Sequence, residues 1–193
     1  MSVAEALAAV LAAPDDLLAR LLYAEALDAQ SGGGDPRAEL IRVQCALLAE
    51  ADRSARIGLR ARATRLLREH GYAWRAPLRA AGADGEFHRG FIEKVRVPMW
   101  RGLPKGFAGL FEVEPVCDVD FGYAQKSDGL RDFFEKGLVK RLTHLRMFAN
   151  ANTLAALCAA EGAEGLRYLG LRGGGVGAQG LALVAGSPRL AGL

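Results

Sequence analysis

The stretch LRYLGLRGGGVGAQGLALVAGSPRLAGL, residues 166–193, carries the pattern that decides the fold. Its first leucines, Leu166, Leu169 and Leu171, stand three and then two positions apart. Side chains in a β-strand point alternately to opposite faces, so Leu169 and Leu171 share one face. A strand this short cannot bury its apolar side chains alone and needs equivalent neighbours. The spacing therefore predicts one strand of a larger sheet.

The same spacing occurs repeatedly along the second half of the chain. Copies begin at Ile92, Val116, Leu142 and Leu166, and a partial copy begins at Leu190, so that successive starts lie 24 or 26 residues apart. Self-similarity with a period of about 20–29 residues and this leucine spacing is the signature of a leucine-rich repeat. We therefore predict parallel strands whose cores lie near residues 92–97, 116–121, 142–147 and 166–171.

Each predicted strand should be followed by a turn and a helix. Asn150 stands where the repeat places an asparagine that fixes the turn, and Gly174 occupies the equivalent position of the next copy. Helices are expected after Asn152 and after Val176, the second one short because glycine costs about 1 kcal/mol per position relative to alanine inside a helix. The apolar faces of the strands should form one buried row, which includes Leu145, Met147, Leu169 and Leu171.

The alternation also predicts which side chains lie on the opposite face of the sheet. One row contains Lys94, Asp118, His144 and Tyr168, the next Arg96, Asp120, Arg146 and Gly170, and the third Pro98, Gly122, Phe148 and Arg172. Opposite charges on neighbouring strands attract each other. We therefore expect Asp118 to pair laterally with Lys94. Asp120 should pair in the same way with Arg96 and Arg146.

This pairing leaves an aromatic and basic group on the same face without predicted ion pairs: His144, Phe148, Tyr168 and Arg172. Aromatic and arginine side chains are enriched in the hot spots of protein interfaces. We therefore predict a partner-binding surface. Its residues are His144, Arg146, Phe148, Tyr168, Arg172, Asp118 and Asp120. The alternative is a solvated sheet on which the aromatic residues have no partner.

The first 86 residues show no strand pattern and are predicted to form helices. N-terminal caps are predicted at Ser2, which forms a capping box with Glu5, and at Asp35, which is followed by Pro36. The second helix should bury an apolar stripe made of Leu17, Leu18, Leu21 and Leu22. A fourth helix is expected to end at Gly71.

The stretch EALDAQSGGGDPRAELIRVQCALL, residues 25–48, resembles the motif of a bacterial repeat-companion domain, an N-terminal module found beside leucine-rich repeats. The matching positions are Asp35, Pro36, Arg37, Ala38, Glu39 and Gln44. The segment FHRGFIEKVRVPMW, residues 87–100, resembles the family's downstream segment. The resemblance implies an α/β architecture, with an N-terminal helical domain over residues 1–86 and a short leucine-rich-repeat solenoid with a parallel sheet, similar to ribonuclease inhibitor, over residues 87–193. It implies no catalytic activity.

Composition and charge narrow the class of protein. The formal net charge is +3, too small to imply a polyanionic partner for the whole chain. No run of about 18 apolar residues could span a bilayer, and the N-terminus lacks the basic flank of a signal peptide, so we expect a cytoplasmic protein. We expect reduced thiols and neither a metal nor a cofactor, because the cysteines and histidines lack ligand spacing. These residues are Cys45, Cys117, Cys158, His70, His88 and His144.

A basic segment leaves one alternative function open. Eight arginines but a single acid, Glu69, lie between Arg53 and Arg79. Such a helix can bind nucleic acid or an acidic partner. No aromatic residue stands between the arginines of residues 53–68, however, which favours a solvated helix face whose charges pair with acids elsewhere.

A second alternative is the regulatory arm of an enzyme. Asp35 and Glu39 lie four positions apart on one helix, but no nucleophile converges on them by sequence, and capping explains Asp35. The glycine-rich residues 172–180 lack the Lys-Ser/Thr of a phosphate-binding loop. We therefore predict a non-catalytic module that binds an unknown protein through the concave face of its sheet. The incomplete repeat at Leu190 also predicts either self-association through an open sheet edge or a chain that is a fragment of a longer repeat array.

Overall fold

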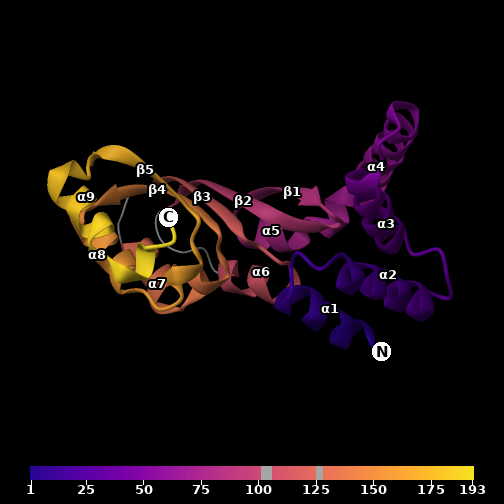
Figure 1. Cartoon of the computed structure of the whole chain (residues 1–193). Coiled ribbons are helices and arrows are strands. Elements are labelled where there is room, and N and C mark those ends of the chain that lie inside the picture. Colours follow the sequence, from indigo (N-terminus) through magenta and orange to yellow (C-terminus); the bar gives the residue numbers. More distant parts are fainter. Residues whose placement is uncertain (101–105, 125–127) are drawn as a thin grey trace. The chain divides into compact units, whose positions relative to one another are not determined.

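The computed structural model describes residues 1–100, 106–124 and 128–193 (Figure 1). These residues form a mixed α/β fold with one open, mostly parallel sheet, whose five strands are hydrogen-bonded in sequence order. The chain divides into two compact units. The first comprises residues 1–77, 87–92 and 112–115, and the second residues 78–86, 93–111 and 116–193. The boundary between residues 86 and 87 that the sequence predicts stays a prediction.

Four helices make up most of the first unit: α1 (Val3–Ala12), α2 (Leu17–Ser31), α3 (Pro36–Ala49) and α4 (Arg53–Trp74). The capping box of α1 is present, because Ser2 Oγ accepts from the N–H of Glu5 at 3.2 Å and Glu5 Oε2 accepts from the N–H of Ser2 at 2.7 Å. Asp35 caps α3, with Pro36 at the first helical position. Both predicted caps are confirmed.

Of the four leucines predicted to form the buried stripe of α2, Leu21 is partly buried against the core of the first unit and the other three are exposed. Leu17, Leu18 and Leu22 are 38%, 62% and 36% exposed. The helix instead buries Ala19, Arg20, Ala24 and Ala26. Small alanine side chains allow close packing, and the buried guanidinium of Arg20 donates to the backbone carbonyls of Pro14 and Arg89. Satisfied polar contacts of this kind make the burial of a charged side chain possible.

Helix α4 continues past the glycine at which it was expected to end. Gly71 lies inside the helix, is buried, and leaves room for the Arg75 guanidinium, whose Nη1 would lie 2.7 Å from an added Cβ. The ring of Trp74, at the last helical position, lies 6.0 Å from that of Phe87 and 5.3 Å from that of His70. These contacts favour continuation of the helix to Trp74.

A short helix, α5 (Ala76–Ala80), leads into a hairpin of β1 (Asp84–His88) and β2 (Phe91–Trp100). The two turn residues, Arg89 and Gly90, have φ angles of 51° and 84°. Positive φ at both central positions is typical of a tight two-residue hairpin turn. Gly90 is also required by close packing, because an added Cβ would lie 2.1 Å from Cγ1 of Ile41.

The remaining strands run parallel to β2 and are β3 (Asp118–Ala124), β4 (His144–Asn150) and β5 (Tyr168–Gly175). Val95 is in register with Val119, Val119 with Leu145, and Leu145 with Leu169. This is the register that the repeated spacing predicts. After Phe148 the register shifts, and Asn150 pairs with Gly175 rather than Gly174. The side chain of Asn150 caps the next helix by accepting from the N–H of Thr153 at 2.9 Å.

Helices of the second unit lie along one side of its strands (Figure 1): α6 (Phe107–Val113), α7 (Asp128–Glu135), α8 (Ala151–Ala159) and α9 (Gly177–Ala185). Short 3₁₀ turns precede the later copies of the repeat, at Leu138–Arg141, Ala163–Gly165 and Pro188–Leu190. Phenylalanine rings of α6 and α7 pack against the ring of Phe121 on β3, with centroids 5.8 Å from Phe107 and 5.1 Å from Phe133. The apolar face of the sheet is therefore the face that the helices cover.

The predicted apolar row is buried on β4 and only partly buried on β5, the last strand of the described sheet. Leu145 and Met147 are fully buried, as predicted. Leu169 and Leu171 are only partly buried, because β5 is the last strand of the described sheet. Leu190 is 4% exposed, at the position equivalent to Leu166 of the preceding copy. Self-association through the open edge of β5 stays a prediction.

Candidate partner-binding surface

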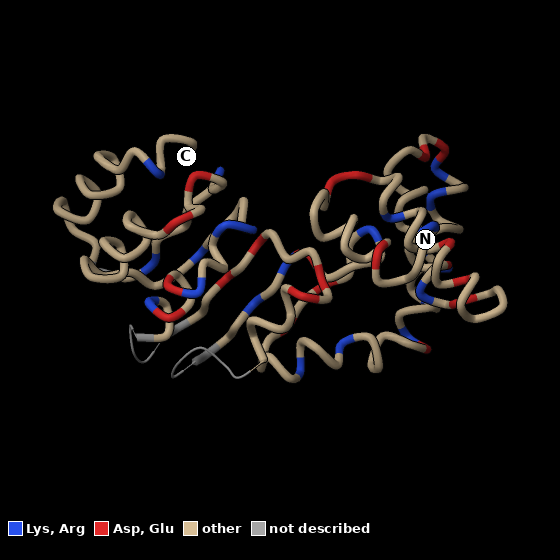
Figure 2. Tube along the Cα trace, turned by 90° about the horizontal axis from the view of Figure 1, so that it is seen from below, with Lys and Arg blue, Asp and Glu red and all other residues tan. Residues whose placement is uncertain are grey.

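The face of the sheet opposite the helices carries the charged and aromatic rows. We call it the polar face, and within the described strands it is formed by Lys94, Arg96, Asp118, Asp120, His144, Arg146, Phe148, Tyr168 and Arg172. The strands that contribute the acidic and basic positions can be followed in Figure 2. All seven partner-binding residues predicted from the sequence lie on this face, because strand alternation and the observed register place them in adjacent positions.

Two arginines reach across strands to the two aspartates of β3. Arg146 Nη1 donates to Asp118 Oδ1 at 2.7 Å. Arg172 forms a bidentate pair with Asp120, with distances of 2.9 and 2.8 Å. The expected pairs of Asp118 with Lys94 and of Asp120 with Arg96 and Arg146 are therefore wrong, and Arg172 is not free of an ion pair. Arginine is long enough to pair diagonally rather than with its nearest lateral neighbour.

An aromatic pair lies beside these ion pairs. The rings of His144 and Tyr168 are stacked, with centroids 5.7 Å apart and planes 24° apart. The guanidinium carbon of Arg146 lies 4.9 Å from the centroid of the Tyr168 ring, within the range of a cation–π contact. Gly170 leaves room for this contact, because an added Cβ would lie 3.0 Å from Cγ of Arg146. Tyr168 contacts both His144 and Arg146 and is still 45% exposed.

The electrostatic surroundings keep Arg146 firmly charged. Partial burial by itself would lower the pKa of its guanidinium. The charge of Asp118, its hydrogen bond with Arg146 and the nearby Tyr168 together outweigh this effect, so the pKa of Arg146 lies above its ordinary value. The contact between Arg146 and Tyr168 is therefore a contact with a cation at every physiological pH.

Two cations of the polar face remain without an ion pair. Lys94 and Arg96 on β2 are exposed, and neither pairs with an acid among the residues that the structure describes. The sequence prediction paired them laterally with Asp118 and Asp120 and therefore left them out of the candidate binding residues. Once Arg146 and Arg172 occupy the two aspartates, Lys94 and Arg96 are the cations available to another molecule.

The residues of the D-P-R-A-E motif make structural contacts within the first unit. Asp35 Oδ1 accepts from the N–H groups of Arg37 and Ala38, at 2.8 and 3.0 Å. Arg37 Nη2 donates to the buried carboxylate of Glu114 at 3.0 Å, and Glu39 pairs with Arg62. These partners account for both carboxylates of the motif, so their four-residue spacing requires no acid–base role.

Gln44, the last residue of the motif, holds the β1–β2 hairpin. Its Oε1 accepts from the N–H of Gly90 at 2.6 Å, and its Nε2 donates to the carbonyl of Phe87 at 3.2 Å. Arg37 lies over the rings of Phe87 and Phe91, at 4.7 and 5.4 Å from their centroids. The motif therefore joins α3 to the start of the sheet.

Helix α4 carries the second charged surface. Arg53, Arg60 and Arg65 are exposed and have no ion pair among the described residues. Arg62 pairs with Glu39, and Arg56 Nη1 donates to the carbonyl of Glu50 at 3.2 Å. The expected pairing with acids elsewhere therefore accounts for only part of the basic segment.

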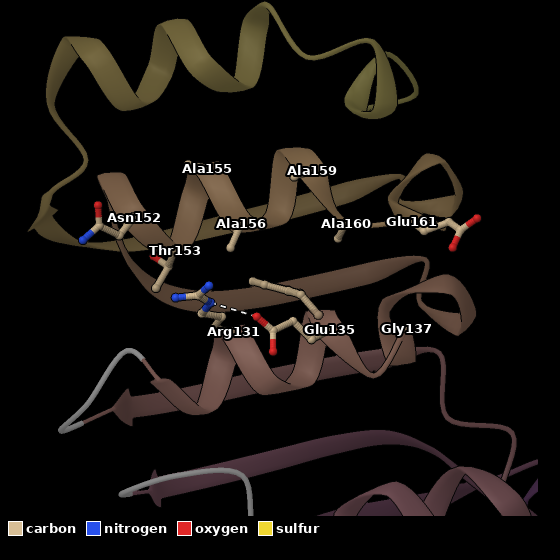
Figure 3. Close-up of a pocket in the computed structure, with 11 residues that line it drawn as sticks. Arg131, Glu135, Gly137, Asn152, Thr153, Ala155, Ala156, Ala159, Ala160 and Glu161 are labelled. Atoms are coloured by element: carbon tan, nitrogen blue, oxygen red, sulfur yellow. Dashed lines mark hydrogen bonds and ion pairs between the residues drawn. The ribbon is translucent and has the colours of Figure 1, made fainter.

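A groove between α7 and α8 has a volume of about 650 Å³ (Figure 3). Its lining includes the ring of Phe134 and a set of alanines on α8: Ala155, Ala156, Ala159 and Ala160. Arg131 and Glu135 on its rim pair with each other, with Nε and Oε1 2.8 Å apart. The groove depends on the distance between two helices, so no sequence pattern predicts it, and it presents no convergent reactive groups.

Three further features of the described part of the chain bear on the class of protein: its cysteines, its potential metal ligands and the length and polarity of its helices. Cys45, Cys117 and Cys158 form no disulfide with one another. Within residues 1–100, 106–124 and 128–193, no group of three or more histidine, cysteine or acidic side chains is arranged to hold a metal ion. Across the same residues, every helix is too short or too polar to cross a bilayer.

Comparisons of this chain with models of protein families, with curated proteins and with solved structures find no match.

Proposed function

We propose that the second unit is a short array of leucine-rich repeats, and that the chain is a non-catalytic module that binds a protein partner through the polar face. The proposal is supported by the 24- and 26-residue steps of the sequence and by the parallel register of β2–β5. The resemblance to repeat-companion domains extends it to the N-terminal helices. Repeat arrays offer extended sheet surfaces to partners. The proposal keeps the cytoplasmic location expected from the sequence.

The observation that carries this proposal is that Tyr168 is exposed and yet already held by neighbouring side chains. Its ring is 45% exposed, yet it is stacked on His144 and lies against Arg146, which is itself fixed by Asp118. A side chain that is already ordered loses less conformational entropy when a partner binds. Exposed tyrosines and arginines of this kind are frequent hot spots.

The first prediction concerns binding by this patch. Changing Tyr168 and Arg172 together to alanine should weaken partner binding by at least about tenfold, because two hot-spot side chains are removed. Partners would be identified by cross-linking in cell extract, purified, and titrated against the wild type and the double variant by calorimetry. Far-UV circular dichroism would establish that the variant is folded. Unchanged affinity in a folded variant would contradict the proposal.

One observation favours a second candidate function, the binding of a polyanion by α4. Arg53, Arg60 and Arg65 are exposed cations without ion pairs among the described residues. The titration would therefore include a variant with Arg53 and Arg60 changed to alanine. If that variant loses the partner and the variant at Tyr168 and Arg172 retains it, α4 is the binding surface. A steep fall of affinity with salt would then identify phosphate contacts.

A further inference from the structure

The positive charge of the polar face is concentrated at one end. The face carries four basic residues, Lys94, Arg96, Arg146 and Arg172, and two acids, Asp118 and Asp120. Arg146 and Arg172 occupy the two carboxylates. The excess of two positive charges, four minus two, is therefore located at Lys94 and Arg96 on β2. An unpaired cluster of one sign attracts the opposite charge.

The aromatic patch lies at the other end of the same row. Lys94 is in register with Asp118, Asp118 with His144, and His144 with Tyr168. Three steps between neighbouring strands, at about 4.8 Å each, separate β2 from β5 by about 14 Å. An extended peptide advances about 3.3 Å per residue, so four or five residues span this distance.

We infer that the partner presents an acidic, extended segment that crosses the polar face from β2 to β5, an inference that rests on the proposed function. Two carboxylates at one end of the segment pair with Lys94 and Arg96. An aromatic or aliphatic side chain, four or five residues away, packs on the exposed part of Tyr168. The segment is thus defined by an acidic pair and an apolar anchor at a fixed spacing.

The middle of the face explains why the ligand is a peptide rather than a nucleic acid. Asp118 and Asp120 are 16% and 15% exposed and lie between the two ends. A nucleic acid has a phosphate at every nucleotide, but between the two ends of the described polar face it would meet no unpaired cation, because Asp118 and Asp120 already hold Arg146 and Arg172. A peptide can place its carboxylates at β2 alone and cross the aspartates with uncharged residues.

The test uses a display library of random linear peptides, selected on the immobilised full chain. The enriched sequences should contain two adjacent acidic residues and an aromatic or aliphatic residue four or five positions away. A fluorescent peptide of the enriched sequence would then be titrated by anisotropy. Changing Lys94 and Arg96 to alanine should reduce its affinity at least about tenfold and flatten its salt dependence.

The matched control removes one lysine and one arginine from the helical side of the same unit. Arg131 and Lys136 form exposed pairs along α7 with Glu135 and Asp132. Changing Arg131 and Lys136 to alanine alters the net charge by the same amount and should leave the peptide affinity unchanged. A charge reversal, Lys94→Glu with Arg96→Glu, should select peptides in which lysine or arginine replaces the acidic pair.

The outcomes separate this inference from the proposed function. If the selected peptides have no acidic pair but lose affinity with Tyr168→Ala, the binding surface stands and the acidic ligand is overturned. If single-stranded DNA binds the wild type more tightly than every selected peptide, or if no peptide is enriched, the inference is also overturned. If the Lys94 and Arg96 variant and the control variant lose the same peptide affinity, the loss comes from net charge alone and the inference is overturned.

Discussion

The first unit buries Arg20 fully and most of Arg37, whereas the second places its paired arginines on a more exposed sheet face. Arg20 is fully buried, and Arg37 lies against Glu114 and three aromatic rings. Arg146 and Arg172 are 23% and 41% exposed. A buried charge that loses its partner is costly, while an exposed ion pair contributes about 0–1 kcal/mol. The arginines of the first unit therefore contribute more to its stability than the paired arginines of the polar face contribute to that of the second.

The buried pair should give the largest effect. Glu114 is 4% exposed, accepts from Arg37 and from the N–H of Ile92, and has a pKa raised by burial above its ordinary value. Changing Glu114 to alanine leaves the buried guanidinium without its carboxylate and should reduce the free energy of unfolding by about 3–5 kcal/mol in a urea melt.

Glu114→Gln is the matched control for this variant. Its amide oxygen can still accept from Arg37 or from the N–H of Ile92, so the loss of stability should be smaller than for Glu114→Ala. A loss below about 1 kcal/mol in the alanine variant would show that the pair does not maintain the first unit.

The apolar row should give the next largest effect. Leu145 is fully buried on β4, and a Leu→Ala change at such a site costs about 2–5 kcal/mol. Leu169 is its register partner on β5 but is only partly buried, so the same change should cost about 1–2 kcal/mol. Parallel urea melts would compare the two variants. Equal losses would mean that β5 is covered in solution, as self-association through its edge would cause.

The exposed pair of Arg172 with Asp120 should give the smallest effect. Changing Asp120 to asparagine should alter the free energy of unfolding by less than about 1 kcal/mol, because solvent and salt screen the pair. The same melt repeated at high salt should reduce even this difference. A loss of stability as large as that of Glu114→Ala would show that the exposed pair of the second unit stabilises it as much as the buried pair stabilises the first.

The strands and their register could be predicted because each depends on a local pattern that is repeated. Alternation defines the faces, and the 24- or 26-residue step aligns Val95, Val119, Leu145 and Leu169. The same pattern marks Asn150 as the residue that fixes the turn after β4, and the structure adds that its side chain caps the next helix. These features require no knowledge of how far a side chain reaches.

The predictions that proved wrong depended on how far a side chain reaches and how closely two elements pack, and a sequence shows neither. Leu17, Leu18 and Leu22 suggested a buried stripe, but α2 packs through its alanines and through Arg20, whose donors meet backbone carbonyls. The partners of Asp118 and Asp120 depend on the length of arginine and on the space above Gly170. The predicted binding residues share one face, but the free cations at its β2 end emerge only from the observed pairs.

The order in which segments of the chain contribute to the two units limits where the gene can be divided. It passes from one unit to the other five times before residue 116, and the first unit takes Phe91 and Glu114 from segments that follow its helices. A gene break after residue 77 would therefore deprive the first unit of part of its core. Residues 116–193 form one continuous segment of the second unit, so copies of the repeat can be duplicated or deleted there without disturbing this exchange. Recombination can therefore change the number of strands after residue 116 more easily than it can separate the second unit from the first.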